Sequence, residues 1–569
     1  MLIGHLLLLC WQCVLAVSAG DGYAERLELR PLQGNVVLAS FAFSNSEYFP
    51  RILRKMMRGK RELHVRFSQG RWQEKSWGIP PRDGYMAGGT GVEVWAWVER
   101  DHGLQHWRSL TNQLAGLFCA SINTLDETRA VCPLLSFHPL GNYSDLGDLQ
   151  LYRGSLPREP VCTENLTPFL KLLPCKGIAG VASLLDGHKL FDSVWQSMAV
   201  DVWTECHDGQ CSLRMTQQVD MAIGVERSLL LQHSAVPYSL PLDKLACDTE
   251  KVFESAEACY PRENARDLQW TLRDIFGKSI QGRCPVSRTS NTEGDVCLSM
   301  PKEHNIISDQ ENSLDNSAQE VTFEESDDFV RKCFAIKGDS TLNIGVDGAD
   351  HASTIPVLRP PIDVHRSLSG YGSERGGMRV VISNIHSEAV NIVYLESLPW
   401  YLKPYLHTLT TTVSGVSKSH DVLITNIYYR PALDRERGTL LEMSLTIPPE
   451  STVVFAYEFE KAILRYTEYP PDANRGFDIA PAVVTIKGLG SLGGDIQLRT
   501  TSVLLSLPTP DFSMPYNVII LTSTVVALAF GSVFNLLVRN FVAVDEVQLS
   551  SIWKWKSLLS RFGRRRDNQ

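Results

Sequence analysis

Apolar and polar residues alternate with a period of two in several short stretches of this 569-residue chain. The alternation at 63–67 and 441–447 is typical of strands with one buried face, and Pro448 ends the second run. A helical period is clear at 107–119. We therefore expect a mainly β protein with tandem β-sandwich-like domains, and a β-propeller is the alternative. Runs of β-branched and aromatic residues between turn residues predict further strands at 36–43, 92–98, 378–382 and 453–459.

The longest apolar stretch near the C-terminus covers residues 518–538, which hold no charged residue and one strongly polar residue, Asn535. A helix of 21 residues is roughly 30 Å long and can cross the hydrocarbon core of a bilayer. An unpaired amide is costly in lipid, so we expect Asn535 to contact a neighbouring helix. The tail at 539–569 holds seven basic and three acidic residues, which places it in the cytosol and the preceding chain in a lumen.

Residues 1–19 have the pattern of a cleavable signal peptide. An apolar core at 6–17 leads into small residues at 17–19, although no Lys or Arg precedes the core. We therefore expect a single-pass type I membrane glycoprotein with most of its length in the lumen. Two sequons on that side, at Asn142 and Asn165, predict glycans on loops.

An acidic stretch suggests where the lumenal part divides. Residues 301–328 hold nine acidic residues and one lysine. Such a composition buries too little apolar surface to offset chain entropy, which predicts a mobile loop at 301–328. The loop would separate a cysteine-containing β-rich domain at 20–300 from a second β-rich domain at 329–507.

Cysteine usage fits an oxidising compartment. Of 13 cysteines, 11 lie between Cys119 and Cys333, and an odd number cannot pair completely within one chain. Cys206 and Cys211 flank a short loop that contains a histidine, but no second ligand pair occurs at a matching spacing. We therefore expect a local disulfide between Cys206 and Cys211 rather than a metal site.

The remaining motifs give no argument for catalysis. The glycine pattern at 488–493 follows a predicted strand but precedes another strand, so we interpret it as a hairpin turn and not as a dinucleotide site. No Gly-x-Ser-x-Gly segment is present. The net charge is −9, and no stretch before residue 518 is basic enough for a nucleic-acid surface. We expect no cofactor and no metal.

A polar, proline-rich hook at 508–517 precedes the apolar stretch. Asp511, Ser513 and Asn517 would lie at the lumenal membrane surface, where lipid headgroups lie. Their side chains can pair with sugar hydroxyls, phosphate oxygens or an ammonium group. The alternative is a rigid stalk stiffened by the three prolines of the hook.

Six segments together resemble one known family, the PIG-T subunit of the glycosylphosphatidylinositol (GPI) transamidase. The resemblance runs from about residue 25 to 540. The segments are FSQGRWQEKSWG at 67–78, SLTNQLAGLFCAS at 109–121, CTENLTPFLKLLPC at 162–175, PWYL at 399–402, EYPPDANRGF at 468–477 and PTPDFSMPYN at 508–517.

This resemblance implies a complex of the endoplasmic-reticulum membrane that replaces the C-terminal signal of proproteins with a GPI anchor. The chain would be a non-catalytic subunit that stabilises the complex and presents substrates. The catalytic Cys and His would belong to a separate caspase-like subunit. The implied partners are that subunit, further multi-pass and single-pass subunits, the GPI lipid and the proprotein signal.

The resemblance also implies roles for particular residues. Cys175 would form a disulfide with the catalytic subunit, whereas a bond within the chain is the alternative. Asn474 and the hook residues Asp511, Ser513 and Asn517 would contact the GPI headgroup. Two other classes stay open: a type I cell-surface receptor or adhesion ectodomain, and a lumenal hydrolase.

Overall fold

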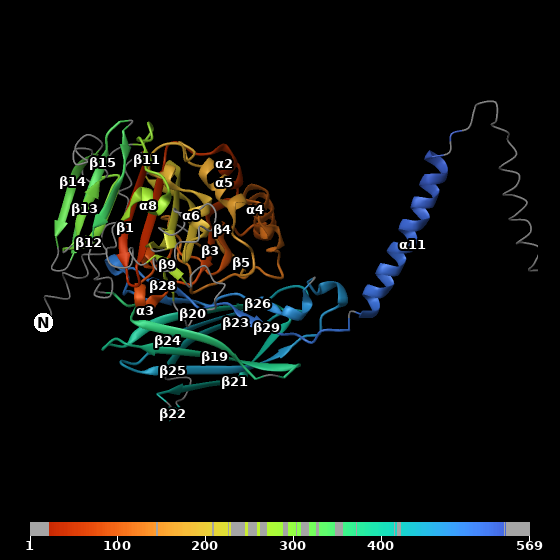
Figure 1. Cartoon of the computed structure of the whole chain (residues 1–569). Helices are drawn as coiled ribbons and strands as arrows, with labels where there is room; N and C mark the ends of the chain where they lie inside the picture. The colour runs from red at the N-terminus through yellow and green to blue at the C-terminus, as the bar shows by residue number, and fades with distance from the viewer. Residues whose placement is uncertain are drawn as a thin grey trace, which may run out of the picture. The chain divides into compact units, whose positions relative to one another are not determined.

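The structure is a computed structural model that describes most of residues 22–541 (Figure 1). The chain forms two compact units, Met1–Leu507 and Pro508–Gln569, and each is described by itself. The predicted signal peptide at 1–19 and the tail beyond residue 541 lie outside the described residues. The internal gaps are 144–145, 208–209, 226, 229–244, 248–258, 262–269, 288–293, 303, 309–317, 326–328, 339, 348–356, 371, 415, 418–422, 471, 512 and 540.

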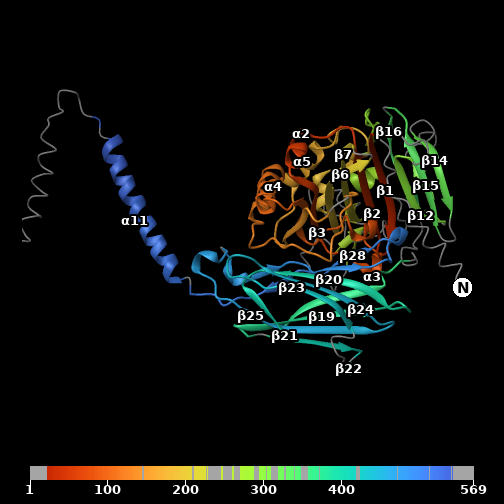
Figure 2. The same ribbon diagram turned by 180° about the vertical axis from the view of Figure 1, so that it is seen from behind.

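A ten-stranded sheet forms the framework of the first half of the chain (Figures 1 and 2). Its neighbouring strands are antiparallel, except that β1 and β12 run parallel. From edge to edge the strands are β14 (Ala318–Glu325), β15 (Phe329–Ile336), β12 (Val296–Pro301), β1 (Tyr23–Leu32), β2 (Val36–Asn45), β7 (Gln210–Gly224), β6 (Trp195–His207), β3 (Lys60–Gly70), β4 (Gly91–Glu99) and β5 (Leu149–Leu156).

One face of this sheet carries the largest apolar core. In β3, Leu63, Val65 and Phe67 alternate onto this face and belong to one buried cluster with Trp107 of helix α4 (Gly103–Phe118). The strand and helix predicted at 63–67 and 107–119 are therefore confirmed, because both periods place apolar residues on one side. Further helices add apolar residues to the same cluster, namely α2 (Arg51–Met56), α5 (Thr163–Lys171), α6 (Gly187–Phe191) and α8 (Leu272–Phe276).

The acidic stretch at 301–328 differs from the predicted loop, because its described residues include two strands. β13 (Asn305–Ser308) pairs with β17 (Ile344–Asp347), and β14 is an edge strand of the ten-stranded sheet. The first β-rich region therefore continues to β17 and does not end near residue 300. Short strand pairs complete it, formed by β8 (Leu245–Cys247), β9 (Cys259–Pro261), β10 (Trp270–Thr271), β11 (Ile280–Gln281) and β16 (Thr341–Leu342).

Exposed charged side chains explain why β14 has the composition of a loop. Glu324 forms an ion pair with Arg331 on β15, with 3.3 Å between Oε2 and Nη1. Lys332 lies over the ring of Phe323 at 5.4 Å. Charged residues on an edge strand oppose pairing with other chains, so an acidic composition is compatible with a strand at this position.

The second half of the described chain is a sandwich of two five-stranded sheets, with the short pair β26 (Phe477–Ile479) and β29 (Val503–Leu505) beside it. Met378, Val380 and Ile382 of one sheet and Ile392 and Tyr394 of the other belong to a second buried cluster. The mainly β prediction is confirmed, and the described strands form open sheets rather than propeller blades. The first sheet has β18 (Ile362–Ser369), β19 (Arg375–Asn384), β25 (Thr452–Lys461), β21 (Leu402–Val413) and β22 (Val416–Ser417); the other has β23 (Ile424–Arg430), β24 (Thr439–Ile447), β20 (Val390–Leu398), β27 (Val483–Ile486) and β28 (Ile496–Arg499).

The opposite face of the ten-stranded sheet is also buried, and the residues that β3 places on it are polar. On β3, Glu62, His64 and Arg66 are at most 3% exposed. His64 contacts Asp201 at 2.7 Å and Glu62 at 3.1 Å, and Arg66 donates to Asp201 at 2.6 Å. Burial lowers the pKa of His64, but the two carboxylates outweigh it and raise the pKa overall. The polar positions of this strand therefore form ion pairs instead of facing water.

Charged groups on this polar face join the first region to the sandwich. Glu93 accepts from Arg153 at 3.0 Å and from Arg499 of β28 at 2.8 Å, and all three residues are buried or nearly so. Glu442 of β24 is fully buried and accepts hydrogen bonds from three consecutive backbone amides at 134–136. Since a buried carboxylate needs such partners, these contacts bind the two regions into one unit.

The described part of the second unit contains one long helix, α11 (Ser513–Val538), which is apolar enough to cross a membrane. Thr524 and Ser532 donate to the carbonyls four residues earlier, at 2.7 and 2.8 Å. Their hydroxyls are thus satisfied within the helix, as a lipid environment requires. The helix begins at Ser513, so half of the predicted hook at 508–517 is helical.

Candidate functional site

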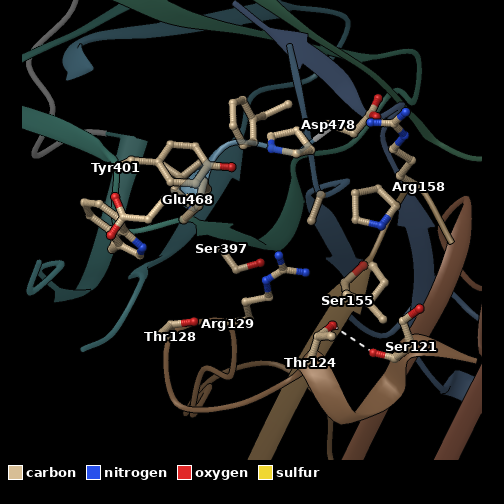
Figure 3. A pocket seen from close by; sticks show the side chains of 18 of the residues that line it. Ser121, Thr124, Thr128, Arg129, Ser155, Arg158, Ser397, Tyr401, Glu468 and Asp478 are labelled. Atoms are coloured by element: carbon tan, nitrogen blue, oxygen red, sulfur yellow. Dashed lines mark hydrogen bonds between the residues drawn. The ribbon is translucent and has the colours of Figure 1, made fainter. Parts of the chain in front are cut away.

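A cleft of about 770 Å³ lies where the first β region meets the sandwich (Figure 3). The first region contributes Ser121, Thr124 and Arg129 to its lining, and the sandwich contributes Tyr401 and Glu468 among others. Three of the segments that carry the family resemblance, 109–121, 399–402 and 468–477, therefore meet at this cleft. Their meeting makes this cleft the main candidate site of the first unit.

One wall of the cleft is fixed by an arginine held between an aromatic ring and a carboxylate. The guanidinium of Arg435 lies 4.8 Å from the ring centre of Trp400 and forms an ion pair with Glu468. A second bond from the same guanidinium to Glu468 measures 3.1 Å. The Glu468 carboxylate also accepts from the backbone amide of Arg465 at 2.7 Å. Arg435 and Glu468 thus neutralise each other's charge.

Aromatic rings continue this wall. The ring centres of Tyr401 and Phe477 are 5.1 Å apart, and those of Tyr469 and Phe477 are 6.3 Å apart. Burial raises the pKa of the Tyr401 hydroxyl, with a smaller lowering by Arg129 and a raising by Asp478. The hydroxyl therefore stays protonated and can donate a hydrogen bond into the cleft.

Asn474, the headgroup contact implied by the resemblance, is exposed on the 3₁₀ turn Ala473–Arg475. It lies two residues before Gly476, which lines the cleft together with Phe477, but Asn474 does not itself belong to the lining. The structure thus places Asn474 at the margin of the cleft.

The other three implied contacts belong to the second unit. Ser513 and Asn517 are exposed in the first turns of α11, and their spacing of four residues puts them on one helix face. The Asp511 carboxylate accepts from the Ser513 amide at 2.9 Å, and hydrogen bonds from Ser513 lower the pKa of Asp511. Asp511 is therefore ionised and caps the helix, which is its structural role.

At Cys175 the structure differs from the expected bond to another subunit. In this chain Cys175 is bonded to Cys284, with 5.9 Å between the Cα atoms. This is the intrachain pairing that the sequence left open as the alternative, and a thiol can form one such bond at a time. A bond from Cys175 to a partner therefore requires exchange of this one.

The other described cysteines fall into two groups. Cys206 and Cys211 are bonded across the β6–β7 hairpin, the local pairing that their spacing predicts, and Cys297 is bonded to Cys333. Three described cysteines carry no disulfide, namely Cys119, Cys132 and Cys162. Among the described residues, no group of three or more His, Cys, Asp or Glu side chains is placed to hold a metal ion.

Comparison with known proteins decides the family. The family model described as "Gpi16 subunit, GPI transamidase component" matches residues 6–562. The GPI transamidase component GPI16 of Saccharomyces cerevisiae is 38% identical over 94% of this chain and 92% of its own length. The human GPI-anchor transamidase component PIGT is 31% identical over 93% of this chain and 92% of its own length.

This chain belongs to the Gpi16 family of GPI transamidase components. The resemblance to PIG-T is thereby confirmed. Among solved structures, a collagen-binding domain of an Erysipelothrix rhusiopathiae surface protein matches with a TM-score of 0.15 over 41% of this chain and 90% of its own length, and such a match carries no argument.

In this Gpi16-family chain the two sequons have different surroundings. Asn142 is exposed. Asn165 is 1% exposed, its amide nitrogen donates to the carbonyl of Phe118 at 2.7 Å, and its oxygen accepts from the amide of Cys162 at 2.8 Å. A glycan on Asn165 would have to replace a hydrogen of this buried amide, so the structure contradicts the predicted glycan there. Asn165 instead belongs to the capping box at the start of α5, where its oxygen accepts from the N-cap amide of Cys162, and it connects α5 to the end of α4.

We predict that Asn142→Gln removes one glycan, whereas Asn165→Gln removes none. The reason is that oligosaccharide transfer needs an accessible amide nitrogen. Electrophoretic mobility with and without glycosidase treatment measures both variants, and Asn165→Gln should also lower the unfolding free energy by about 1–3 kcal/mol through its lost buried bonds. A second glycan on the wild-type chain that disappears in Asn165→Gln would contradict this assignment.

Sequence reasoning missed most of the polar side chains of the cleft in this Gpi16-family member. Trp400, Tyr401 and Glu468 lie in segments that carry the family resemblance, but no motif marked them as neighbours of Arg129 or Arg158. Their proximity depends on how the sandwich packs against the first region, for which a single sequence holds no local pattern.

Proposed function

We propose that this chain is a non-catalytic structural and substrate-presenting subunit of GPI transamidase, the enzyme that replaces the C-terminal signal of proproteins with a GPI anchor. The observation that carries the proposal is the family match over nearly the whole chain. The apolar helix α11 supports a membrane-anchored subunit. The joined β regions support a scaffolding role, because buried ion pairs hold them as one body.

The location that fits this function is the endoplasmic-reticulum membrane, with the β regions in the lumen and the basic tail in the cytosol. In this orientation α11 begins at the lumenal surface, and Asp511, Ser513 and Asn517 lie at headgroup level. We propose that these three residues, together with Asn474, contact the GPI headgroup. Exposed hydroxyl, amide and carboxylate groups on the first turns of α11 support this role.

We further propose that the catalytic Cys and His lie on a caspase-like partner and that Cys175 forms a disulfide with that partner in the assembled complex. A partner thiolate would attack the sulfur of Cys175, and Cys284 would leave as a thiolate. The number of disulfides is unchanged by this exchange, so no oxidant is needed.

Purification of a tagged chain from membranes tests the function. The wild-type chain should co-purify with a caspase-like protease and with multi-pass subunits. Depletion of the chain should leave a GPI-anchored reporter unprocessed, and re-expression should restore its anchoring. Normal anchoring in depleted cells, or purification of the chain without these partners, would overturn the proposal. Surface exposure on intact cells would instead favour a receptor.

We predict that Asn535→Leu weakens the association of α11 with other membrane helices about threefold, because a transmembrane polar contact contributes on average ~0.6 kcal/mol. The Asn535 amide makes no hydrogen bond to any described residue, so it is free to bond a neighbouring helix. The yield of partners after detergent extraction measures the effect. Val533→Leu, on the opposite helix face, is the matched control. An equal loss in both variants would contradict a specific amide contact.

A further inference from the structure

Two arginines in the interdomain cleft have no partner among the described residues. Arg129 and Arg158 are both exposed and line the cleft, and neither guanidinium makes a hydrogen bond or an ion pair to any residue that the structure describes. Figure 3 shows Arg129 reaching into the middle of the space, whereas Arg158 is drawn at the edge of the space, with its side chain directed toward Asp478 in this view. The cleft thus presents two free cations.

The acidic side chains of the cleft are already engaged. Glu468 is paired with Arg435, and Asp478 with Arg475 at 3.4 Å. Glu159 accepts from the backbone amide of Ser121 at 2.6 Å. Three arginines and three carboxylates line the cleft, so its formal charge is balanced. The guanidinium groups without a hydrogen-bond or ion-pair partner among the described residues are those of Arg129 and Arg158, and their planar donors fit phosphate oxygens.

The rest of the lining is aromatic or hydroxylated. Trp400, Tyr401 and Phe477 form the wall from the sandwich, as described above. The opposite side offers the hydroxyl groups of Thr124, Ser155 and others, and these lie across the space from Tyr401 in Figure 3. Aromatic faces cover the C–H face of a sugar ring, and hydroxyls exchange hydrogen bonds with its O–H groups.

We propose that this cleft binds a phosphate-bearing glycan, with Arg129 and Arg158 on the phosphate and the Trp400–Tyr401–Phe477 wall on the sugar. A volume of about 770 Å³ accommodates a phosphorylated mono- or disaccharide. The source of the ligand rests on the proposed function, since the glycan of a GPI lipid carries phosphate on sugar. An acidic peptide is the less favoured occupant, because it would use the arginines but not the hydroxyl-lined side.

The test uses the purified full-length chain in detergent and the probe mannose 6-phosphoethanolamine. Wild type should bind the probe, and Arg129→Gln/Arg158→Gln should bind it at least tenfold more weakly. Both arginines are exposed and unpaired, so the double variant should keep the wild-type melting temperature. Arg51→Gln, an exposed arginine on α2 outside the cleft, is the matched control. Mannose, inorganic phosphate and an acidic peptide serve as comparison probes.

Binding that is lost in the double variant and kept in the control supports the proposal. Equal binding by wild type and double variant would overturn it, as would inorganic phosphate or the acidic peptide binding as tightly as the phosphosugar. Detergent-solubilised GPI lipid added as a competitor identifies the source: displacement of the probe supports the lipid glycan, and lack of displacement overturns that part. In cells, the double variant should still co-purify with its partners but anchor the reporter several-fold less. If the wild-type chain does not co-purify with the other subunits, the proposed function is refuted, whatever the binding measurements on the cleft show.

Discussion

Replacing Glu93 with glutamine is expected to lower the free energy of unfolding of this chain by about 3–5 kcal/mol. The carboxylate of Glu93 lies between Arg153 at 3.0 Å and Arg499 at 2.8 Å, and it is 1% exposed. Without this charge, the nearly buried guanidinium groups of Arg153 and Arg499 have no counterion. A buried charge without a partner destabilises a protein far more than the loss of an ion pair at the surface does. Urea unfolding followed by tryptophan fluorescence measures the change.

The pH dependence of the same variant gives an independent check. Burial raises the pKa of Glu93, but Arg499 and Arg153 outweigh it and lower the pKa to about 2. A carboxylate with a lowered pKa contributes its full stability above its unfolded value and loses it as the pH falls through the folded value. The difference between wild type and Glu93→Gln should therefore be constant above roughly pH 4.5 and shrink between about pH 4.5 and 2.

Glu127→Gln is the control for both measurements. Glu127 also pairs with an arginine, Arg108, but this pair is exposed to solvent. Exposed ion pairs contribute about 0–1 kcal/mol, so the control should unfold almost as the wild type does. An equal effect of the two substitutions would show that burial of Glu93 between the two β regions is not what stabilises them.

Glu93 also illustrates what a single sequence leaves undetermined about the fold. Strand positions follow from local alternation, and β3 and β24 lie where the pattern predicts them. The same alternation indicates that the polar positions of β3 face water, whereas Glu62, His64 and Arg66 are buried. Burial of that face depends on chain segments far away in sequence, such as Arg499, so local periodicity cannot predict it. Composition misled in a similar way at 318–325, where the exposed charges of an edge strand resembled those of a loop.

For the candidate sites, the family-like segments predicted which parts of the chain matter but not how they meet. Tyr401 and Glu468 lie together in the cleft, but nothing in the sequence brings Arg129 to the same place. Asn165 matched a glycosylation motif, yet its amide is used to cap a helix, since a three-residue motif carries no information on burial. The pairing of the cysteines was open for a similar reason. A spacing of five residues predicts the bond between Cys206 and Cys211, but no spacing rule predicts the bond between Cys175 and Cys284, which are 109 residues apart.

Replacing Cys284 with serine is expected to leave a reducible link between this chain and its caspase-like partner intact, whereas Cys175→Ser should abolish the link completely. In the single chain the two cysteines are bonded to each other. In the wild-type chain the interchain bond forms by exchange and releases Cys284 as a thiol, so the finished link does not contain Cys284. In Cys284→Ser the thiols of Cys175 and of the partner are instead joined by oxidation, and a disulfide oxidant of the oxidising lumen takes up the two electrons and two protons. Non-reducing electrophoresis of the tagged chain from membranes measures the link.

The state of Cys284 distinguishes exchange from a permanent intrachain bond. Cys284 is fully buried, so a maleimide reagent should label it only after denaturation. Denatured complex should show one more labelled thiol on this chain than denatured isolated chain, and the extra thiol should map to Cys284. Cys206→Ser, which breaks a local hairpin bond, is the control and should leave the link unchanged. If the wild-type chain instead runs as a monomer and the Cys284→Ser variant acquires a link, the intrachain bond persists in the complex and Cys175 does not join the two subunits.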